Sequence, residues 1–301
     1  MTRLWAAAPA VFVLVWSTGF VGAKYGLPDA DPFAFLAVRL AIAAALLALA
    51  CLVTRTGLTR GQAGRAAVSG LLLHATYLGG VFWAISRGTP AGVSSVVVSL
   101  QPVLVAVLAG RLLGESLVSR QWVGLVLGVV GVALVLAPGL GGAVPPAGLA
   151  SCLLALAGGT AGTLWQKRHG DGIPLLPGTL VQYAAAGTVL AGLSLLTERP
   201  TVHWTPRFAL ALAYLVVALS IGAVLLLLAL LRRGSAAGVS TLFYLVPPAT
   251  AIESYLLFGE QLAALSVIGI VVAAAGVALV VVPARQPAHV AADLPLGAKV
   301  R

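Results

Sequence analysis

The chain has 301 residues, of which 60% are hydrophobic and only 9% are charged. A soluble domain has about 25% charged residues, so this chain has too few polar residues to cover a water-facing surface. The formal net charge is +10, but no basic cluster alternates with aromatic side chains that would stack on bases. The composition therefore excludes a soluble nucleic-acid-binding protein and predicts an all-α membrane protein.

Ten apolar segments follow one another along the chain, and each is long enough to cross a bilayer as a helix of about 18 or more residues. The first segment resembles the apolar core of a signal peptide, but it runs on to Lys24 and similar segments follow it, so we interpret it as a transmembrane helix. Asp31-Pro32 and Thr205-Pro206 have the cap-then-proline pattern of a helix start. The expected helices cover residues 5–24, 33–53, 65–86, 92–113, 120–137, 147–166, 177–196, 208–231, 237–258 and 263–282.

The two halves of the chain repeat a pattern. LQPVLVAVLAGRLLGES at residues 100–116 returns about 145 positions later within YLVPPATAIESYLLFGEQ at residues 244–261, and GVALV occurs at both Gly131 and Gly276. Each half holds five expected helices, and this odd number makes the second half enter the bilayer from the opposite face. Two inverted five-helix repeats around a central cavity are a recurrent plan of secondary transporters.

The repeats also set the expected domain organisation. The break at Gly139-Leu-Gly-Gly142 separates a first repeat at 1–142 from a second at 143–284, and a polar tail at 285–301 is expected to be disordered and cytoplasmic. Thirteen of the 18 Lys and Arg residues lie on one side of the bilayer if the N-terminus is cytoplasmic. This positive-inside bias predicts that both termini face the cytoplasm, in a plasma (inner) membrane.

Two patterns resemble the EamA-type domain of the drug/metabolite transporter superfamily, over residues 5–282. The first is Trp16-Ser-Thr-Gly-Phe20 followed by Lys24 and Arg39. The second is a proline followed by Gly-Glu and two more glycines, and it occurs at Pro102, Gly114, Glu115, Gly124 and Gly131 and again at Pro247, Gly259, Glu260, Gly269 and Gly276. The resemblance implies ten helices, a central cavity and efflux of amino acids, metabolites or drugs, with proton coupling.

Two titratable residues lie deep in apolar segments. Placing a charge in hydrocarbon costs at least about 2.5–3.5 kcal/mol, so Glu253 is expected either to load and release a proton, to bind a cationic substrate, or to be a neutral acid bonded to a neighbouring helix. His74 titrates near neutral pH and suits a proton relay, or it is a polar packing residue. Tyr77 shares its face of the helix.

Arg39 lies several residues inside the second segment. Its side chain either extends along the helix to the outer interface or binds a substrate carboxylate with its guanidinium fork. Four further polar or aromatic residues interrupt apolar segments and are expected to line the cavity. The complete set for the substrate and proton pathway is Glu253, His74, Arg39, Trp16, Gln101, Tyr77, Tyr244 and Trp165.

Other functional classes have weaker support. An intramembrane enzyme would need a nucleophile beside a base, and the sequence has no such arrangement, no metal motif and no nucleotide-binding loop, so we expect no enzyme activity, metal or cofactor. A passive channel or facilitator remains an alternative. The expected partners are a small-molecule substrate and the lipid bilayer, without nucleic acid. Spacings such as Gly110-x-x-x-Gly114 favour close helix packing and would equally serve a homodimer.

Prolines inside two expected helices predict bends, because proline removes an intrahelical hydrogen bond. These are Pro102 in the fourth segment and Pro247 and Pro248 in the ninth. We expect the bends to act either as hinges at equivalent points of the two halves or as static kinks.

Overall fold

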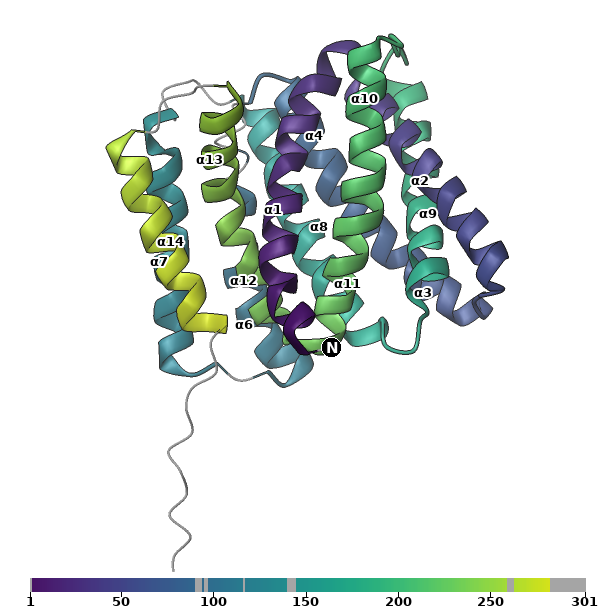
Figure 1. Ribbon diagram of the computed structural model, residues 1–301. Helices are drawn as coiled ribbons and strands as arrows, with labels where there is room; N and C mark the ends of the chain where they lie inside the picture. The colour runs from purple at the N-terminus through teal and green to yellow at the C-terminus, as the bar shows by residue number, and fades with distance from the viewer. Residues whose placement is uncertain are drawn as a thin grey trace, which may run out of the picture.

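The computed structural model describes residues 2–89, 94, 97–115, 117–139, 145–258 and 263–281. Throughout these ranges the regular structure is helical, apart from one isolated bridge between Ala30 and Val202. The helices form a single bundle with roughly aligned axes (Figure 1). Five helices of the described chain are long and apolar enough to cross a membrane, and shorter apolar helices accompany them. The prediction of an all-α membrane protein is confirmed at this level.

The first half of the bundle contains α1 (Thr2–Gly26), the 3-10 turn η1 (Leu27–Asp29), α2 (Pro32–Thr54), α3 (Arg60–Gly70), the π-helix η2 (Leu71–Leu78), α4 (Gly79–Ser86), α6 (Gln101–Leu113), α7 (Ser119–Leu136) and the 3-10 turn η3 (Ala137–Gly139). The second half contains α8 (Pro146–His169), α9 (Leu175–Thr197), α10 (Pro206–Tyr214), the π-helix η4 (Leu215–Ala223), α11 (Val224–Arg233), α12 (Ala236–Thr241), the 3-10 turn η5 (Leu242–Leu245), α13 (Val246–Phe258) and α14 (Ala264–Val281).

The predicted helix starts at Pro32 and Pro206 are confirmed, but the two starts are capped differently. Thr205 Oγ1 accepts a hydrogen bond of 3.1 Å from the third backbone amide of α10. At α2 the side chain of Asp31 makes no capping bond. Instead the carboxylate of Glu198, just past the end of α9, accepts bonds of 2.9 and 3.1 Å from the second and third amides of α2. Glu198 thereby ties α9 to α2.

Two continuous helices contain a central π-helical segment. Arg60–Ser86 is α3, η2 and α4 in sequence, and Pro206–Arg233 is α10, η4 and α11. A π-helix is rare, and it places one extra residue in a turn, often at a functional site. These two segments could not be predicted, because the apolar pattern of the sequence runs through them unchanged.

Two expected helices are interrupted. The expected helix at 92–113 is interrupted by a turn at residues 99–100, and its counterpart at 237–258 contains the 3-10 turn η5 between α12 and α13, in each case just before a proline. The expected bends, as hinges or as static kinks, stay a prediction. Pro102 lies in the first turn of α6, and Pro247 lies in the first turn of α13 after the 3-10 turn η5. In the first turn a proline leaves no amide unsatisfied, and so it marks a helix start.

The most extensive helix contact joins α7 and α14, at one edge of the bundle (Figure 1). A Cβ added at Gly124 would lie 2.6 Å from Gly276 O, and one added at Gly269 would lie 2.6 Å from Gly131 O. The backbones are therefore in direct contact, as small residues permit. Because the low-numbered glycine of α7 meets the high-numbered glycine of α14, the two helices are antiparallel.

Polar contacts tie together the ends of the helices. At the end of the bundle that holds the N-terminus, Glu115 accepts hydrogen bonds from the first two backbone amides of α12, and Lys167 Nζ donates to the carbonyls of Leu231 and Gly234. Glu115 therefore caps α12. Three features named in the sequence analysis lie outside the described residues. They are Glu260, residues 140–142 of the expected boundary between the repeats, and the tail at 285–301.

Candidate functional site

A central cavity of about 100 Å³ lies between helices of both halves. That is several times the ~10–15 Å³ that admits one water molecule. The two π-helices, η2 and η4, both contribute to its wall. Five of the predicted site residues line it, namely Trp16, Arg39, His74, Tyr77 and Gln101.

Arg39 reaches the cavity from α2 and is only 5% exposed. Its Nε donates a hydrogen bond of 2.9 Å to Ser220 Oγ on η4. The Ser220 carbonyl in turn accepts a hydrogen bond from the Tyr183 hydroxyl on α9. Arg39 thus points into the bundle, and the interpretation in which it extends to the outer interface is wrong. Its burial in an apolar surrounding is costly, at least about 2.5–3.5 kcal/mol.

His74 lies on the opposite π-helix, η2, and is 7% exposed. Its Nε2 is 3.3 Å from Gln182 Oε1, and Gln182 Nε2 donates to Gln166 Oε1 at 3.3 Å. The imidazole ring also meets the Tyr183 ring edge to face, with centroids 4.9 Å apart. The histidine therefore makes the polar contact with a neighbouring helix that a packing role requires, while its side chain still borders the cavity.

Gln101 begins α6 and is 4% exposed. Its Nε2 donates a hydrogen bond of 3.2 Å to Thr163 Oγ1 on α8, which also lines the cavity. This contact joins the broken fourth segment to the second half of the bundle.

Glu253 does not line the cavity. It projects from α13 toward α1, where its Oε1 lies 2.5 Å from Ser17 Oγ. Ser17 Oγ also lies 2.9 Å from the Leu14 carbonyl. The other carboxyl oxygen, Oε2, is buried without a hydrogen-bond partner in the described part of the chain. Ser17 has one hydroxyl proton for two acceptors, so the pair has room for one more proton.

Trp165 and Tyr244 also lie outside the cavity. Trp165 donates from Nε1 to the Arg65 carbonyl at 3.0 Å, and its ring stacks on His169 near the end of α8. Tyr244 is fully buried, with its ring against Gly128 of α7. Both positions are consistent with helix packing.

Sequence reasoning did not select two important cavity residues. Ser220 holds Arg39, and Phe243 forms part of an aromatic wall. A signal for Ser220 was present in the repeat: it lies 146 positions after His74, the offset that relates Arg87-Gly88 to Arg233-Gly234. Phe243 had no comparable signal, because an aromatic residue in an apolar segment is ordinary.

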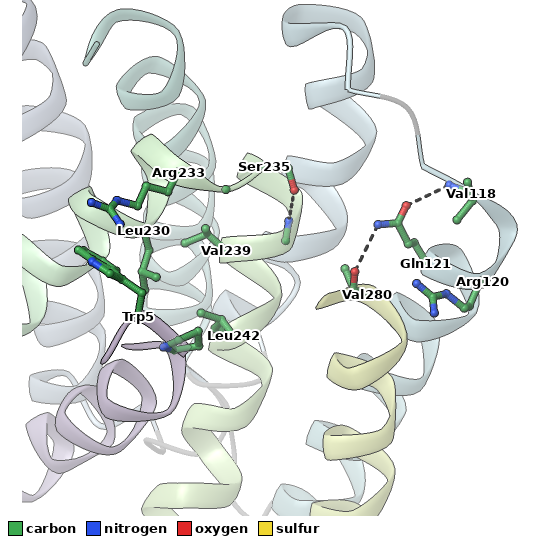
Figure 2. Close-up of a pocket in the computed structure, with 13 residues that line it drawn as sticks. Trp5, Val118, Arg120, Gln121, Leu230, Arg233, Ser235, Val239, Leu242 and Val280 are labelled. Carbon is green, nitrogen blue, oxygen red and sulfur yellow. Dashed lines mark hydrogen bonds between the residues drawn. The ribbon is translucent and has the colours of Figure 1, made fainter. Parts of the chain in front are cut away.

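A second cavity, of about 570 Å³, opens at the end of the bundle that holds the N-terminus. Figure 2 shows Trp5 and Arg233 on one side of it and Arg120 and Gln121 on the other, with α12 between them. The Arg233 guanidinium lies 3.6 Å from the centre of the Trp5 ring. We call this cavity the basic vestibule.

Three aromatic side chains form a cluster next to the central cavity, on the side of the basic vestibule. Phe12, Trp16 and Phe243 contact one another with ring centroids 5.1 to 5.4 Å apart. Along α1 the lining residues pass from Trp5 at the vestibule to Trp16 at the central cavity, and along η5 they pass from Leu242 to Phe243. The aromatic cluster therefore lies at the junction of the two spaces.

No group of three or more His, Cys, Asp or Glu side chains within the described ranges could hold a metal ion. The two cysteines, Cys51 and Cys152, are both buried. The arrangement as a whole is a mainly apolar central cavity that a few polar side chains enter, with a larger basic opening at one end of the bundle.

Comparisons with known proteins agree with this picture. The model of the EamA-like transporter family matches residues 3–137 and again residues 146–282. The chain is 26% identical to the transporter YvbV of Bacillus subtilis, over 90% of this chain and 89% of that protein. It is 29% identical to the inner membrane transporter YedA of Escherichia coli, over 86% and 84%. A solved crystal structure shares the fold, with a TM-score of 0.76, 20% identity, and coverage of 90% of this chain and 94% of that chain. The protein is thus a member of the EamA-like transporter family.

Proposed function

We propose that this protein is a secondary transporter that exports a small organic solute by alternating access, through ten helices arranged as two inverted repeats at 1–142 and 143–284. The observation that carries the proposal is the central cavity, which both halves line and which an aromatic cluster borders on the side of the basic vestibule. In this scheme the protein lies in the plasma membrane. Both termini are cytoplasmic, and the basic vestibule opens to the cytoplasm.

The glycine contacts between α7 and α14 support the inverted repeat. The sequence repeat makes Gly124 equivalent to Gly269, and Gly131 equivalent to Gly276. In the bundle Gly124 meets Gly276, and Gly131 meets Gly269. Gly124 therefore touches the repeat equivalent of Gly131, and Gly131 touches the repeat equivalent of Gly124. A reciprocal contact of this kind has two-fold symmetry. Because these helices are antiparallel, the axis relates two halves of opposite orientation.

Other packing partners follow the same exchange. Helix α1 packs on α13 and η4 of the second half, while its counterpart α8 packs on α6 and η2 of the first half. The helices that contain the π segments begin at Arg60 and Pro206, which are 146 positions apart. Each half thus supplies one π-helix to the cavity wall. Equivalent elements on both sides of a cavity allow one half to open as the other closes.

The aromatic cluster of Phe12, Trp16 and Phe243 is the barrier on the vestibule side of this scheme. Phe12 is completely buried, and in this scheme the three rings would close the path between the two spaces. A shift of α1 relative to η5 would separate the rings and join the vestibule to the central cavity. We expect the interruptions before α6 and α13 to act as hinges in such a movement.

Glu253 is the proposed proton carrier. A proton on its carboxyl group would donate to Ser17 Oγ and free the serine hydroxyl to donate to Leu14. The acid lies on the contact between α1 and α13, which must change if α1 moves. Protonation would therefore stabilise the contact and deprotonation would weaken it, coupling proton exchange to the state of the cavity.

The test uses the full-length protein in liposomes that contain a pH-sensitive dye, challenged with a library of amino acids and small organic acids. A secondary transporter gives saturable, solute-dependent proton movement. Glu253→Gln is expected to keep solute exchange between the two sides and to lose its pH dependence. The matched control is Glu198→Gln, which removes a carboxylate outside the apolar core and should keep the wild-type pH profile.

Two results would count against the proposal. Flux that rises linearly with the driving force and never saturates would indicate a channel. A Glu253→Gln variant with the wild-type pH profile would exclude this residue as the proton carrier while leaving alternating access in place.

A further inference from the structure

We propose that the solute held in the central cavity is a small amphipathic carboxylate, bound through its carboxylate group by Arg39. The proposal names the substrate class of the transport site and so rests on the proposed function. It is based on the positive charge of Arg39, which pairs with no acidic side chain among the described residues.

Arg39 has unused hydrogen-bond donors. The guanidinium group has five N–H donors in a planar fork, and Ser220 accepts from Nε alone. The two terminal amino groups make no hydrogen bond to any described residue, although the side chain is 5% exposed. Because Arg39 is a lining residue of the cavity, these donors border the space where a ligand would lie.

Among the residues that the structure describes, the positive charge of Arg39 also has no acidic partner. Acidic residues are absent from the described lining of the central cavity, and the described carboxylates near the helix ends are engaged elsewhere, as Asp29 is with Arg207. A buried cation without a partner leaves a strong attraction unsatisfied. A carboxylate fits the fork with two parallel hydrogen bonds, which is the geometry that arginine favours over lysine.

The rest of the cavity wall selects for an apolar group beside that carboxylate. Leu40, Phe82, Leu219 and Leu228 supply aliphatic and aromatic surface, and Trp16 adds an indole ring. An inorganic anion such as phosphate would bind Arg39 but would leave this surface without a partner. Apolar contacts therefore favour an organic acid or an amino acid with an apolar side chain.

The basic vestibule fits the same class of solute. Its lining includes Arg120 and Arg233, and its described lining residues include no acidic side chain. A cleft of one charge raises the local concentration of the opposite charge. The positive-inside bias accounts for those two arginines by itself, however, and it does not account for Arg39, seven residues into α2 from its other end. The inference therefore depends on Arg39.

The first experiment compares ligands on the wild-type protein. Binding to the full-length protein in detergent is measured by calorimetry for phenylacetate, isovalerate and phenylalanine, each paired with its primary amide, and for inorganic phosphate. Each carboxylate is expected to bind about tenfold or more tightly than its amide, because the amide loses a charge-assisted pair of hydrogen bonds. Amides that bind as well as the acids, phosphate that binds as tightly, or no binding by any carboxylate would each overturn the proposal.

The second experiment uses variants. Arg39→Gln is expected to abolish the preference for acid over amide, and Arg39→Lys to retain part of it, since lysine keeps the charge and loses the fork. Arg207→Gln removes an arginine outside the cavity and should keep the full preference. If the acids bind through Arg39 but no solute moves across liposomes, the transport proposal fails alone. If amides or cations are transported instead, the transport proposal stands and this one fails.

Discussion

At the scale of single residues, the ion pair between Asp29 and Arg207 holds the ends of α1 and α10 together outside the membrane-spanning segments. Arg207 Nη2 lies 3.0 Å from Asp29 Oδ2, and Thr205 Oγ1 donates to the same oxygen at 3.1 Å. The hydrogen bond from Arg207 is the main reason that the pKa of Asp29 lies below its ordinary value of 3.8. The folded state therefore favours the ionised carboxylate.

A lowered pKa in the folded state makes stability depend on pH. The stabilisation is present above the unfolded-state pKa of Asp29 and is lost as the pH falls below it through the folded-state pKa. We expect Arg207→Gln to lower the melting temperature at pH ~7 and to have a smaller effect near pH ~3, because part of the stabilisation is already lost below the ordinary pKa of the carboxyl. Thermal unfolding in detergent at several pH values measures this.

The matched control for that series is Arg87→Gln. Arg87 lies over the Trp83 ring, 5.2 Å from its centre, and this cation–π contact has no titrating partner. Its effect on the melting temperature should be the same at both pH values. If the effect of Arg207→Gln on the melting temperature did not change with pH, this arginine would not be the cause of the lowered pKa of Asp29.

At the scale of helices, the glycine contact between α7 and α14 makes a different prediction. A methyl group at Gly276 would lie 2.6 Å from the amide nitrogen of Gly128, and neither backbone can yield without parting the helices. We expect Gly276→Ala to reduce the free energy of unfolding by about 1–3 kcal/mol, as overpacking typically does. Unfolding in denaturing detergent, followed by circular dichroism, measures the change.

Gly192 in α9 is the control for the helix experiment. Nothing lies within 4 Å of a Cβ at this position, and alanine is favoured over glycine in a helix by up to about 1 kcal/mol. Gly192→Ala should therefore be neutral or slightly stabilising. Equal losses from both substitutions would mean that the α7–α14 contact is not close in solution.

At the scale of the whole molecule, the proposed inverted repeat predicts where the connections lie. The link at Gly57 between α2 and α3 and the link at His203 between α9 and α10 are exposed, and five proposed crossings separate them. Single cysteines placed by Gly57→Cys and His203→Cys should react with a membrane-impermeant maleimide on opposite sides. In intact cells His203→Cys should be labelled, and Gly57→Cys only after permeabilisation.

The natural cysteines are suited to that measurement. Cys51 is 8% exposed and Cys152 is inaccessible, so labelling of the wild type should be low. Labelling of both engineered positions from the same side would contradict the odd number of crossings. Labelling of Gly57→Cys alone in intact cells would reverse the proposed orientation and keep the repeat.

The sequence alone determined that this protein is mainly helical and suited to a membrane. Long apolar segments with few charges can satisfy their backbone hydrogen bonds in lipid only as helices, and Pro32 and Pro206 mark helix starts because proline tolerates the first turn. The glycine pattern also identified the family, since small residues recur wherever backbones must touch.

The tertiary structure decided which polar residues meet. Arg39 and Ser220 are 181 positions apart, and only the folded bundle brings them to one cavity. Trp165 and Tyr244 interrupt apolar segments as Trp16 does, yet they pack away from the cavity. Periodicity shows that a side chain departs from the apolar pattern, but the direction it faces depends on the rotation of its helix against its neighbours. The π-helical turns in η2 and η4 change that rotation locally, and no pattern in the sequence predicts these turns.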